Sequence, residues 1–282
     1  MFGRGRIPSK SDADLVAMRR AGLVVAAALD EVVGSCRAGT TTADLDRVAT
    51  AAITVRGGVP SFPEVPGYRH TLCVSVNEQV VHGIPGPREL THGDLVSIDC
   101  GAIVDGWHGD AAVTVVVGGP QAASAADAEL VEVTRGALWA AIGAMAVGNR
   151  IGHIGAAVED FVGAATAASG TRFGIVDGYE GHGIGRAMHM APGVPNTRTR
   201  YRGPIITAGT TLAIEPMLSL GDERTYELTD GWTAVTVDGS RAAHWEHTVA
   251  VTDRGLWVLT AHDGGAAELA ARGLPFGPID GD

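Results

Sequence analysis

Cysteine is scarce in this chain: only Cys36, Cys73 and Cys100 occur among its 282 residues. No two of them form a Cys-x-x-Cys pair, which excludes a zinc ribbon, and three dispersed cysteines do not make the framework of a disulfide-stapled domain. Cys73 and Cys100 lie within apolar stretches, so we interpret them as small packing residues rather than nucleophiles.

Positive charge is also in short supply. The chain has 21 Lys and Arg against 32 Asp and Glu, a net charge of -11, which argues against nucleic acid or a membrane surface as the main partner. No apolar run is long enough to span a membrane, because Gly, Asp or Arg interrupts each one. Residues 1–10 form a short basic arm without the apolar segment of a signal peptide, so we expect a cytoplasmic protein. Two interpretations stay open for Arg4, Arg6 and Lys10: contact with a ribosome and simple solvation.

The chain does have enough apolar sequence for a large core. Hydrophobic residues make up 45% of it, so residues 11–260 can form a single domain. We predict helices over 12–34, 43–56, 125–146 and 151–168, with Thr42 as the N-cap of the second. A loop is expected over 192–209, and a loose tail over 261–282, where Gly, Ala and Pro dominate. Helices grouped ahead of strands favour an α+β fold, with helices covering one face of a curved antiparallel sheet.

The two halves of the chain, about 11–118 and 121–260, echo each other. His82-Gly83-Ile84 recurs as His182-Gly183-Ile184, and each copy precedes two strands that carry one acid each. These strands are predicted near 96–104 and 107–117 in the first half, and near 211–215 and 245–251 in the second. We interpret the pattern as a duplicated unit with pseudo-twofold symmetry and with its site on the axis.

Asp105-Gly106 is the strongest turn signal in the chain, and it joins two apolar strands into a hairpin. If these two residues form the loop, Asp99 lies opposite Ala112, and Asp110, two residues away, points to the same face. Two carboxylates on one half-buried face repel each other unless a cation lies between them. A β-bulge would change this geometry, and a solvated pair of acids is the alternative interpretation.

Glu215 and Glu246 repeat this pattern, because we place each of them in an apolar strand as well. Four carboxylates in one core are costly without cations, and a neighbouring imidazole would complete an N/O ligand set suited to divalent first-row metals. Two such ions would balance the charge and activate a shared water. The spaced glycines of Gly181-x-Gly183-x-Gly185 do not make a phosphate loop, since no Lys-Ser or Lys-Thr follows them.

Nearly the whole chain, residues 12–260, resembles the type I methionine aminopeptidases, which have the pita-bread fold. The motifs that carry the resemblance occur in the same order and spacing, and they are Ser75-Val76-Asn77-Glu78, His82-Gly83-Ile84-Pro85, Gly93-Asp94-Leu95-Val96-Ser97-Ile98-Asp99, Asp105-Gly106-Trp107-His108-Gly109-Asp110, Gly181-His182-Gly183-Ile184-Gly185 with Met188-His189, Ile214-Glu215-Pro216-Met217 and Glu246-His247-Thr248.

The resemblance implies an enzyme that removes the initiator methionine from nascent proteins when the second residue is small. Its metal ligands would be Asp99, Asp110, His182, Glu215 and Glu246. They would hold two divalent cations, such as Co²⁺, Mn²⁺ or Fe²⁺, with Asp110 and Glu246 bridging the pair. Glu215 would also take the proton of the attacking, metal-activated water. We expect a monomer whose partner is the N-terminal peptide of a nascent polypeptide.

The same resemblance assigns the substrate pocket. His82 and His189 match the catalytic histidines that position the N-terminal residue and stabilise the tetrahedral intermediate. The methionine side chain would lie in an apolar slot, whose walls would be Phe62, Tyr68, Cys73, Met188 and Trp232. Val65 stands where the family has an aromatic residue, so the slot could be wider or altered.

Two other functions stay open at this point. Val65 also fits a peptidase of the same fold that is specific for Xaa-Pro, although such relatives usually carry a large extra N-terminal domain. The other is a non-catalytic binding protein of this fold, although such proteins typically lose the ligands that this chain keeps. His108 shares a face with Asp110 but does not match a ligand of the family, and His247 should point away from Glu246.

Overall fold

The structure is a computed structural model that describes residues 7–200 and 202–279. Its helices are α1 (Asp12–Ser35), α2 (Thr42–Val55), α3 (Ala125–Gly143), α4 (Gly152–Ser169) and the short α5 (Ala266–Ala271), with single 3₁₀ turns at η1 (Phe62–Glu64) and η2 (Pro120–Ala122). The strands of the first half are β1 (Val59–Pro60), β2 (Leu72–Val76), β3 (Gln79–Val81), β4 (Leu95–Val104) and β5 (Trp107–Val116). Those of the second half are β6 (Gly174–Ile175), β7 (Gly181–Gly183), β8 (Met190–Val194), β9 (Thr211–Ile214), β10 (Met217–Ser219), β11 (Thr225–Glu227), β12 (Ala234–Thr236), β13 (Ala242–His244), β14 (His247–Val251) and β15 (Leu256–Val258). This arrangement confirms the predicted α+β fold.

Capping boxes start the first two helices. The side chain of Ser11 accepts a hydrogen bond from the Asp14 amide, and the Asp14 carboxylate accepts one from the backbone amide of Ser11. Helix α2 begins in the same way, but its cap is Thr41, not Thr42 as we predicted. The Thr42 hydroxyl instead donates to the carbonyl of Gly86 and accepts from its amide. Both threonines fit a cap by residue type, and a partner from a distant loop decides between them.

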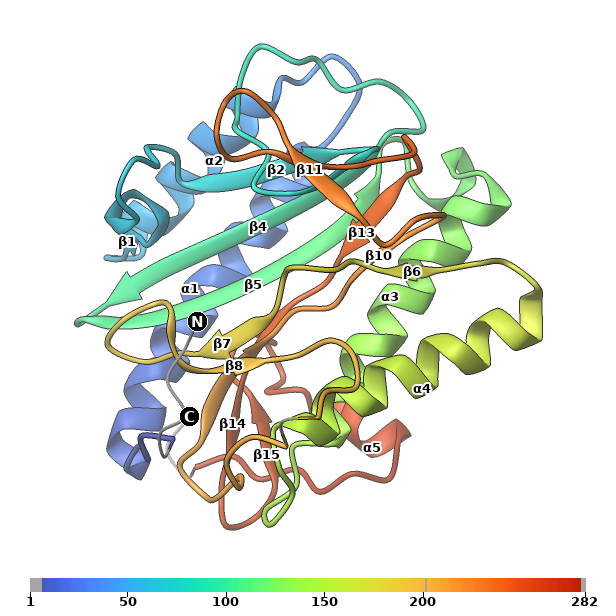
Figure 1. Cartoon of the computed structure of the whole chain (residues 1–282). Coiled ribbons are helices and arrows are strands. Elements are labelled where there is room, and N and C mark those ends of the chain that lie inside the picture. Colours follow the sequence, from blue (N-terminus) through green and yellow to red (C-terminus); the bar gives the residue numbers. More distant parts are fainter. Residues whose placement is uncertain (1–6, 201, 280–282) are drawn as a thin grey trace.

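The central hairpin has the predicted register. Asp99 lies opposite Ala112, and Asp110 lies opposite Gly101, without a bulge. Asp105 and Gly106 both have positive φ angles, 51° and 76°, as a two-residue type I′ turn requires. The two aspartates are therefore diagonal neighbours on one face of a long, continuous hairpin, which crosses the molecule in Figure 1.

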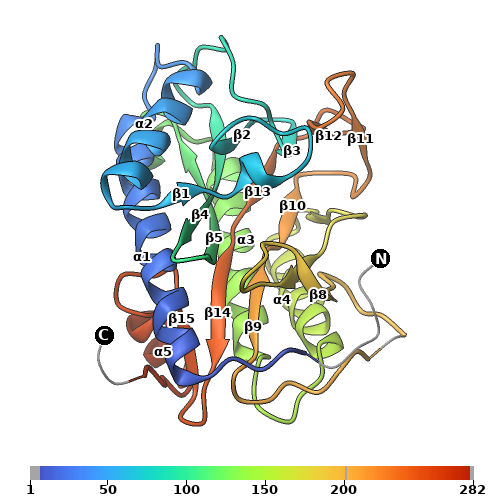
Figure 2. The same ribbon diagram turned by 90° about the vertical axis from the view of Figure 1, so that its left-hand side faces the viewer.

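Each helix pair covers the strands of its own half. Helix α1 packs on β4, β5 and α2, while α3 packs on α4 and on strands β9, β10 and β13; Figures 1 and 2 show both pairs. Glycines let α1 approach β5 closely, because a Cβ on Gly109 would lie 2.8 Å from the amide nitrogen of Gly22. The halves meet where β5 contacts β13 and β14. This junction positions the site.

The described residues of the expected tail, 261–279, are packed and not loose, which corrects our expectation for this part of the chain. Leu269 of α5 is fully buried in the core of the second half, and a β-bridge joins Leu256 to Phe276. The composition of this segment suggested a coil. A few apolar side chains among its many Gly and Ala residues nevertheless pack it against the core of the domain. The expected loop over 192–209 is also shorter, since β8 extends to Val194 and pairs with β7.

The N-terminal arm is described only from residue 7, so Arg4 and Arg6 lie outside the described residues. Lys10 is largely buried, its amide donates to the carbonyl of Gly209, and burial lowers its pKa to about 8. The simple solvation that we considered for Lys10 is therefore wrong. Within the described part of the chain, no helix combines the length and apolar character needed to cross a membrane.

Candidate metal centre

Backbone hydrogen bonds place Asp99 and Glu246 in one row across the junction of the halves. The amide of Glu246 donates to the carbonyl of Ala112 at 2.9 Å, and the amide of Ala112 donates back at 3.3 Å. Ala112 is also the hairpin partner of Asp99. Asp99 and Glu246 are thus separated by a single intervening strand, β5.

A second row of paired residues crosses the sheet from Asp110 to His182. The hydroxyl of Thr248 accepts a hydrogen bond from the amide of Asp110 and donates one to its carbonyl, at 3.0 and 2.8 Å. Thr248 pairs with Ala213 in β9, and Ala213 pairs with His182 in β7. The Thr248 hydroxyl therefore continues the sheet from β14 to β5.

Two glycines give His182 its place between neighbouring strands. A Cβ on Gly181 would lie 2.4 Å from the carbonyl oxygen of Ala213, and one on Gly183 would lie 2.4 Å from that of Ala191. Real Cβ atoms essentially never come so close to backbone atoms. The Gly-His-Gly sequence is thus a packing requirement of β7 and not a phosphate loop.

Glu215 and Glu246 lie in a break between strands, which corrects our placement of both residues inside strands. β9 pairs with β14, and β10 pairs with β13, in the same register on both sides of the break. Extended through the break, this register sets Glu215 opposite Glu246. Pro216 explains the interruption, because it has no N–H for the ladder.

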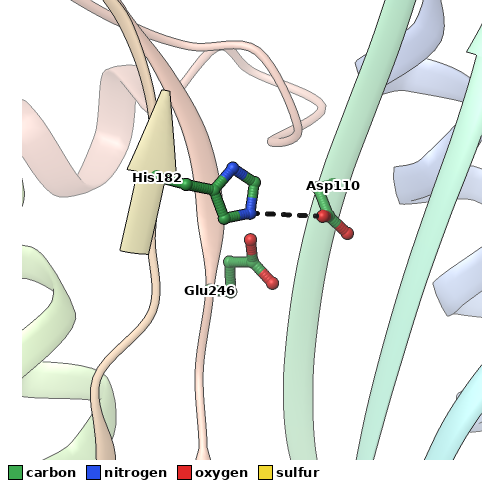
Figure 3. Close-up of side chains that lie close together, drawn as sticks. All are labelled: Asp110, His182 and Glu246. Carbon is green, nitrogen blue, oxygen red and sulfur yellow. Dashed lines mark ion pairs between the residues drawn. The ribbon is translucent and has the colours of Figure 1, made fainter. Parts of the chain in front are cut away.

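The ligand atoms converge on a small volume. Those of Asp110, His182 and Glu246 all lie within 4.8 Å of one another, and Figure 3 shows the three side chains meeting from separate strands and loops. His182 Nε2 is 3.9 Å from Asp110 Oδ2 and 3.6 Å from Glu215 Oε1. Nitrogen and carboxylate oxygen ligands bind such cations at about 2.0–2.2 Å. Two ligand atoms that are 3.6 to 3.9 Å apart therefore leave room for a cation between them.

The electrostatics of the carboxylates fit bound cations. In the described part of the chain, buried oxygens of Asp99, Asp110 and Glu246 have no hydrogen-bond partner. Burial raises the pKa of Asp99 to about 7, and burial with neighbouring carboxylates raises the pKa of Asp110, Glu215 and Glu246 well above their usual range. These oxygens lack partners that a divalent cation would supply, and hard oxygen with imidazole nitrogen is a donor set for first-row metals.

His182 is present as the neutral ligand form. Burial, and then the nearby ring of His189, lower the pKa of His182 to about 4. Its Nδ1 lies 2.9 Å from the carbonyl oxygen of Gly183, which holds the proton on Nδ1 and leaves Nε2 free to bind a cation.

All predicted site residues line one pocket. The five predicted ligands are among its lining residues, and the others are Phe62, Val65, Tyr68, Cys73, His82, Met188, His189 and Trp232. Phe62, Tyr68, Cys73 and Met188 also form one buried apolar cluster, with Val65 and Trp232 packed against it. The structure thus brings together every residue that the sequence assigned to the metals or the substrate, while their individual roles stay predictions.

The walls of the pocket are rigid and apolar. The Tyr68 hydroxyl donates to the carbonyl oxygen of Leu72 at 2.7 Å, so its ring is fixed, and it meets Trp232 edge-to-face at 5.0 Å between ring centroids. Val65 contributes a short side chain to the same wall.

The two predicted catalytic histidines lie at the edge of this apolar wall. His82 has φ of 59°, which is strained for a residue with a side chain and is typical of functional positions. Burial, and then His189, lower the pKa of His82 to about 4, and burial lowers that of His189. Both are therefore neutral hydrogen-bonding groups near pH 7.

The two other histidines that we weighed lie apart from the pocket lining. His108 is held by the hydroxyl of Ser61 at 3.0 Å. His247 is held by the hydroxyl of Thr260 at 2.8 Å and packs on Trp139. The prediction that His247 points away from Glu246 agrees with these contacts.

His244 is a buried residue next to the centre that our sequence reasoning missed. Its side chain is 1% exposed, and its Nε2 is 3.9 Å from Glu215 Oε2. A signal was present, because His244 precedes Glu246 by two residues and alternation along a strand places both on one face.

The comparisons with known proteins agree with this geometry. Residues 16–253 match the model of metallopeptidase family M24. The chain is 53% identical over 259 residues to methionine aminopeptidase 1 of Mycobacterium tuberculosis, covering 92% of this chain and 96% of the relative. Over 251 residues it is 40% identical to methionine aminopeptidase 1 of Bacillus subtilis, covering 89% and 98%. A crystal structure of methionine aminopeptidase from Thermotoga maritima superposes with a TM-score of 0.85 at 40% identity, covering 91% and 100%.

The fold and the buried ligand cluster define a metal-dependent peptidase, and the chain belongs to metallopeptidase family M24. Within that family, it is similar to methionine aminopeptidases over nearly its whole length, and it has their pita-bread fold.

Proposed function

We propose that this protein removes the initiator methionine from nascent polypeptides whose second residue is small, using two divalent cations such as Co²⁺, Mn²⁺ or Fe²⁺. One observation carries the proposal: four carboxylates and a neutral imidazole line the same pocket as a cluster of apolar and aromatic side chains. Such a pocket places a hydrolytic centre beside a slot for an unbranched apolar side chain.

Asp99, Asp110, His182, Glu215 and Glu246 would hold the two cations. The family resemblance would make Asp110 and Glu246 ligands of both cations, and their ligand atoms lie within 4.8 Å of each other and of that of His182. When bound, the cations polarise the scissile carbonyl and make water a nucleophile at neutral pH. They also compensate the charge of carboxylates that burial would otherwise protonate.

Protons move through side chains of this chain. Glu215 would accept the proton of the attacking water, because its carboxylate lines the pocket beside the other predicted ligands and is ionised once the cations compensate its charge. His189 and His82 are neutral, so each can donate an N–H to the oxygen that becomes negative in the tetrahedral intermediate.

The apolar wall selects the N-terminal side chain. Phe62, Tyr68, Cys73, Met188 and Trp232 surround the slot, where a flexible thioether makes favourable contacts with sulfur and aromatic rings. Val65 replaces a larger group on this wall, so unbranched side chains somewhat bulkier than methionine are also expected to bind.

The test compares peptides with a free N-terminal methionine followed by Gly, Ala or Leu. Protein stripped of metal is expected to be inert, and to cleave the Gly and Ala peptides after addition of Co²⁺, Mn²⁺ or Fe²⁺. Undiminished turnover in excess chelator would contradict the metal requirement. Faster cleavage of an Xaa-Pro peptide than of a Met-Ala peptide would make the protein an Xaa-Pro peptidase instead.

We propose nascent chains as the partner, which places the protein in the cytoplasm. A monomeric state is a separate part of the proposal. Contact with the ribosome would have to be made by residues of the arm other than Lys10, because Lys10 is buried against the domain. Co-sedimentation of the protein with ribosomes tests that contact.

A further inference from the structure

His244 stands in a defined relation to Glu215. It pairs with Met217 across β10 and β13, and Glu215 precedes Met217 by two residues. His244 is therefore the diagonal neighbour of Glu215 across an antiparallel pair, as Asp110 is the diagonal neighbour of Asp99. Each half of the fold thus places a polar side chain diagonally opposite one of the predicted ligands.

The backbone of His244 is held firmly in place. The hydroxyl of Thr114 accepts a hydrogen bond from the amide of His244 and donates one to its carbonyl, both at 2.8 Å. A second hydroxyl, that of Ser97, lies 2.9 Å from the Thr114 hydroxyl. The backbone of His244 is thereby tied to the hairpin that carries Asp99 and Asp110.

The imidazole itself lacks a partner at one nitrogen. Within the described residues, no group bonds to the buried Nε2 of His244, and the facing group is Glu215 Oε2 at 3.9 Å. The other oxygen of that carboxylate, Oε1, faces His182 at 3.6 Å. Glu215 thus lies between two imidazoles, one on the side of the predicted ligands and one behind it.

We propose that His244 is a positioning residue whose Nε2–H donates a hydrogen bond to Glu215 Oε2 and fixes the orientation of this carboxylate toward the cations. An ionised carboxylate only accepts hydrogen bonds, so the proton must come from the imidazole. The terminal torsion of a glutamate side chain is broad, and a small rotation brings the two atoms within bonding distance. The inference rests on the proposed function, because it assigns Glu215 to the cations and to the water proton.

With Oε2 held by His244, Glu215 would present its other oxygen, Oε1, to the cation. Groups that hydrogen-bond to a metal ligand typically contribute 10- to 100-fold in metal affinity or activity. Removal of the donor should therefore weaken cation binding and lower kcat, while KM changes little because the apolar slot is untouched.

The experiment uses metal-free full-length protein and the variants His244→Leu, His244→Ala and His244→Gln. Leucine and alanine remove the donor, whereas glutamine retains an N–H at similar reach. Calorimetric titration with Mn²⁺ measures affinity and stoichiometry, circular dichroism checks folding, and cleavage of a Met-Ala peptide at saturating Mn²⁺ gives kcat and KM. We expect the folded donor-free variants to bind Mn²⁺ about 10- to 100-fold more weakly at unchanged stoichiometry, and His244→Gln to recover most of the loss.

His247→Gln is the matched control, because His247 is a partly buried histidine three residues further on whose ring bonds to Thr260 and not to a predicted ligand. It should lower stability without changing the affinity for Mn²⁺. The proposal is overturned by either of two results: unchanged affinity and kcat in a folded donor-free variant, or a stoichiometry lower by one ion, which would make His244 a ligand. If the wild type binds Mn²⁺ but cleaves no methionyl peptide, the proposed function fails, while the binding titration still tests His244.

Discussion

At the scale of single residues, Asp99 is a buried carboxylate whose ionisation is unfavourable unless a cation is bound. Its side chain lines the pocket and has one buried oxygen to which no described group donates a hydrogen bond. Burial raises its pKa to about 7, so in metal-free protein the ionised form is disfavoured. A cation removes that penalty, which means that the same side chain destabilises the empty centre and stabilises the loaded one.

Asp99→Asn should therefore change the stability of metal-free protein in a pH-dependent way. Because the folded-state pKa lies above the unfolded value of 3.8, ionisation costs stability as the pH rises from about 4 to 7. In chelator at pH 8, the variant should gain roughly 1–3 kcal/mol over the wild type relative to their difference at pH 4.5. Urea denaturation at the two pH values measures this, and a difference that does not depend on pH would contradict the raised pKa.

Glu215→Gln tests the assignment of the base. Glutamine keeps the shape of the side chain but cannot accept the water proton, so kcat should fall roughly 100- to 10,000-fold at saturating metal. The side chain is only 14% exposed, so solvent is poorly placed to replace it. Assay at several Mn²⁺ concentrations separates weaker binding from lost turnover, and near-normal kcat would mean that another group is the base.

At the scale of secondary-structure elements, β7 depends on its two glycines. Gly183→Ala would place a Cβ 2.4 Å from the carbonyl oxygen of Ala191, and backbone atoms cannot move aside as a side chain does. We expect a loss of about 1–3 kcal/mol in stability together with weaker Mn²⁺ binding, because His182 moves with the strand. Thermal unfolding and Mn²⁺ titration measure the two effects.

Gly163→Ala is the control for this variant. Gly163 lies within α4 and has nothing within 4 Å of an added Cβ, so alanine should raise stability by up to about 1 kcal/mol. Equal behaviour of the two variants would show that β7 tolerates a side chain and that the Gly-His-Gly pattern has another cause.

Local signals predicted some elements well. The Asp105-Gly106 turn determines the register of β4 and β5, since a two-residue loop leaves one pairing. The sequence could not show that Glu215 and Glu246 lie in a break between strands. Pro216 is visible in the sequence, but the pairing that sets Glu246 beside the interruption is known only from the folded chain. Helix α5 escaped prediction for a similar reason: a single fully buried leucine, Leu269, packs a segment whose composition suggests a coil.

His244 marks the limit of prediction at the site. The resemblance to a family predicted the metal ligands and the substrate-pocket residues, and all of them line one cavity. His244 belongs to none of those motifs, and its separation of 3.9 Å from Glu215 in the folded chain identifies it. Alternation with Glu246 predicts the face on which it lies, but the distance to Glu215 follows from the pairing of β10 with β13.

At the scale of the whole molecule, the centre links the two halves of the fold. Asp99 and Asp110 belong to the first half, while His182, Glu215 and Glu246 belong to the second. A cation bound to both sets should therefore stabilise the entire domain, by about 2.7 kcal/mol for each site at a concentration 100 times its Kd.

Loading with Mn²⁺ should accordingly raise the unfolding temperature, and by more at pH 8 than at pH 6. The raised pKa values of Asp99 and its neighbours mean that protons compete with the cation at the lower pH. Differential scanning calorimetry with and without chelator measures both shifts. An equal rise at the two pH values would show that the carboxylates are already ionised before the metal binds.

The most direct test of the account is a titration of metal-free wild-type protein with Mn²⁺ or Co²⁺, in which free methionine released from a Met-Ala peptide is measured at each addition. The account predicts no release in chelator, and release that rises with bound metal and levels off at no more than two ions per chain. Full methionine release in excess chelator, or bound metal without any release, would contradict it.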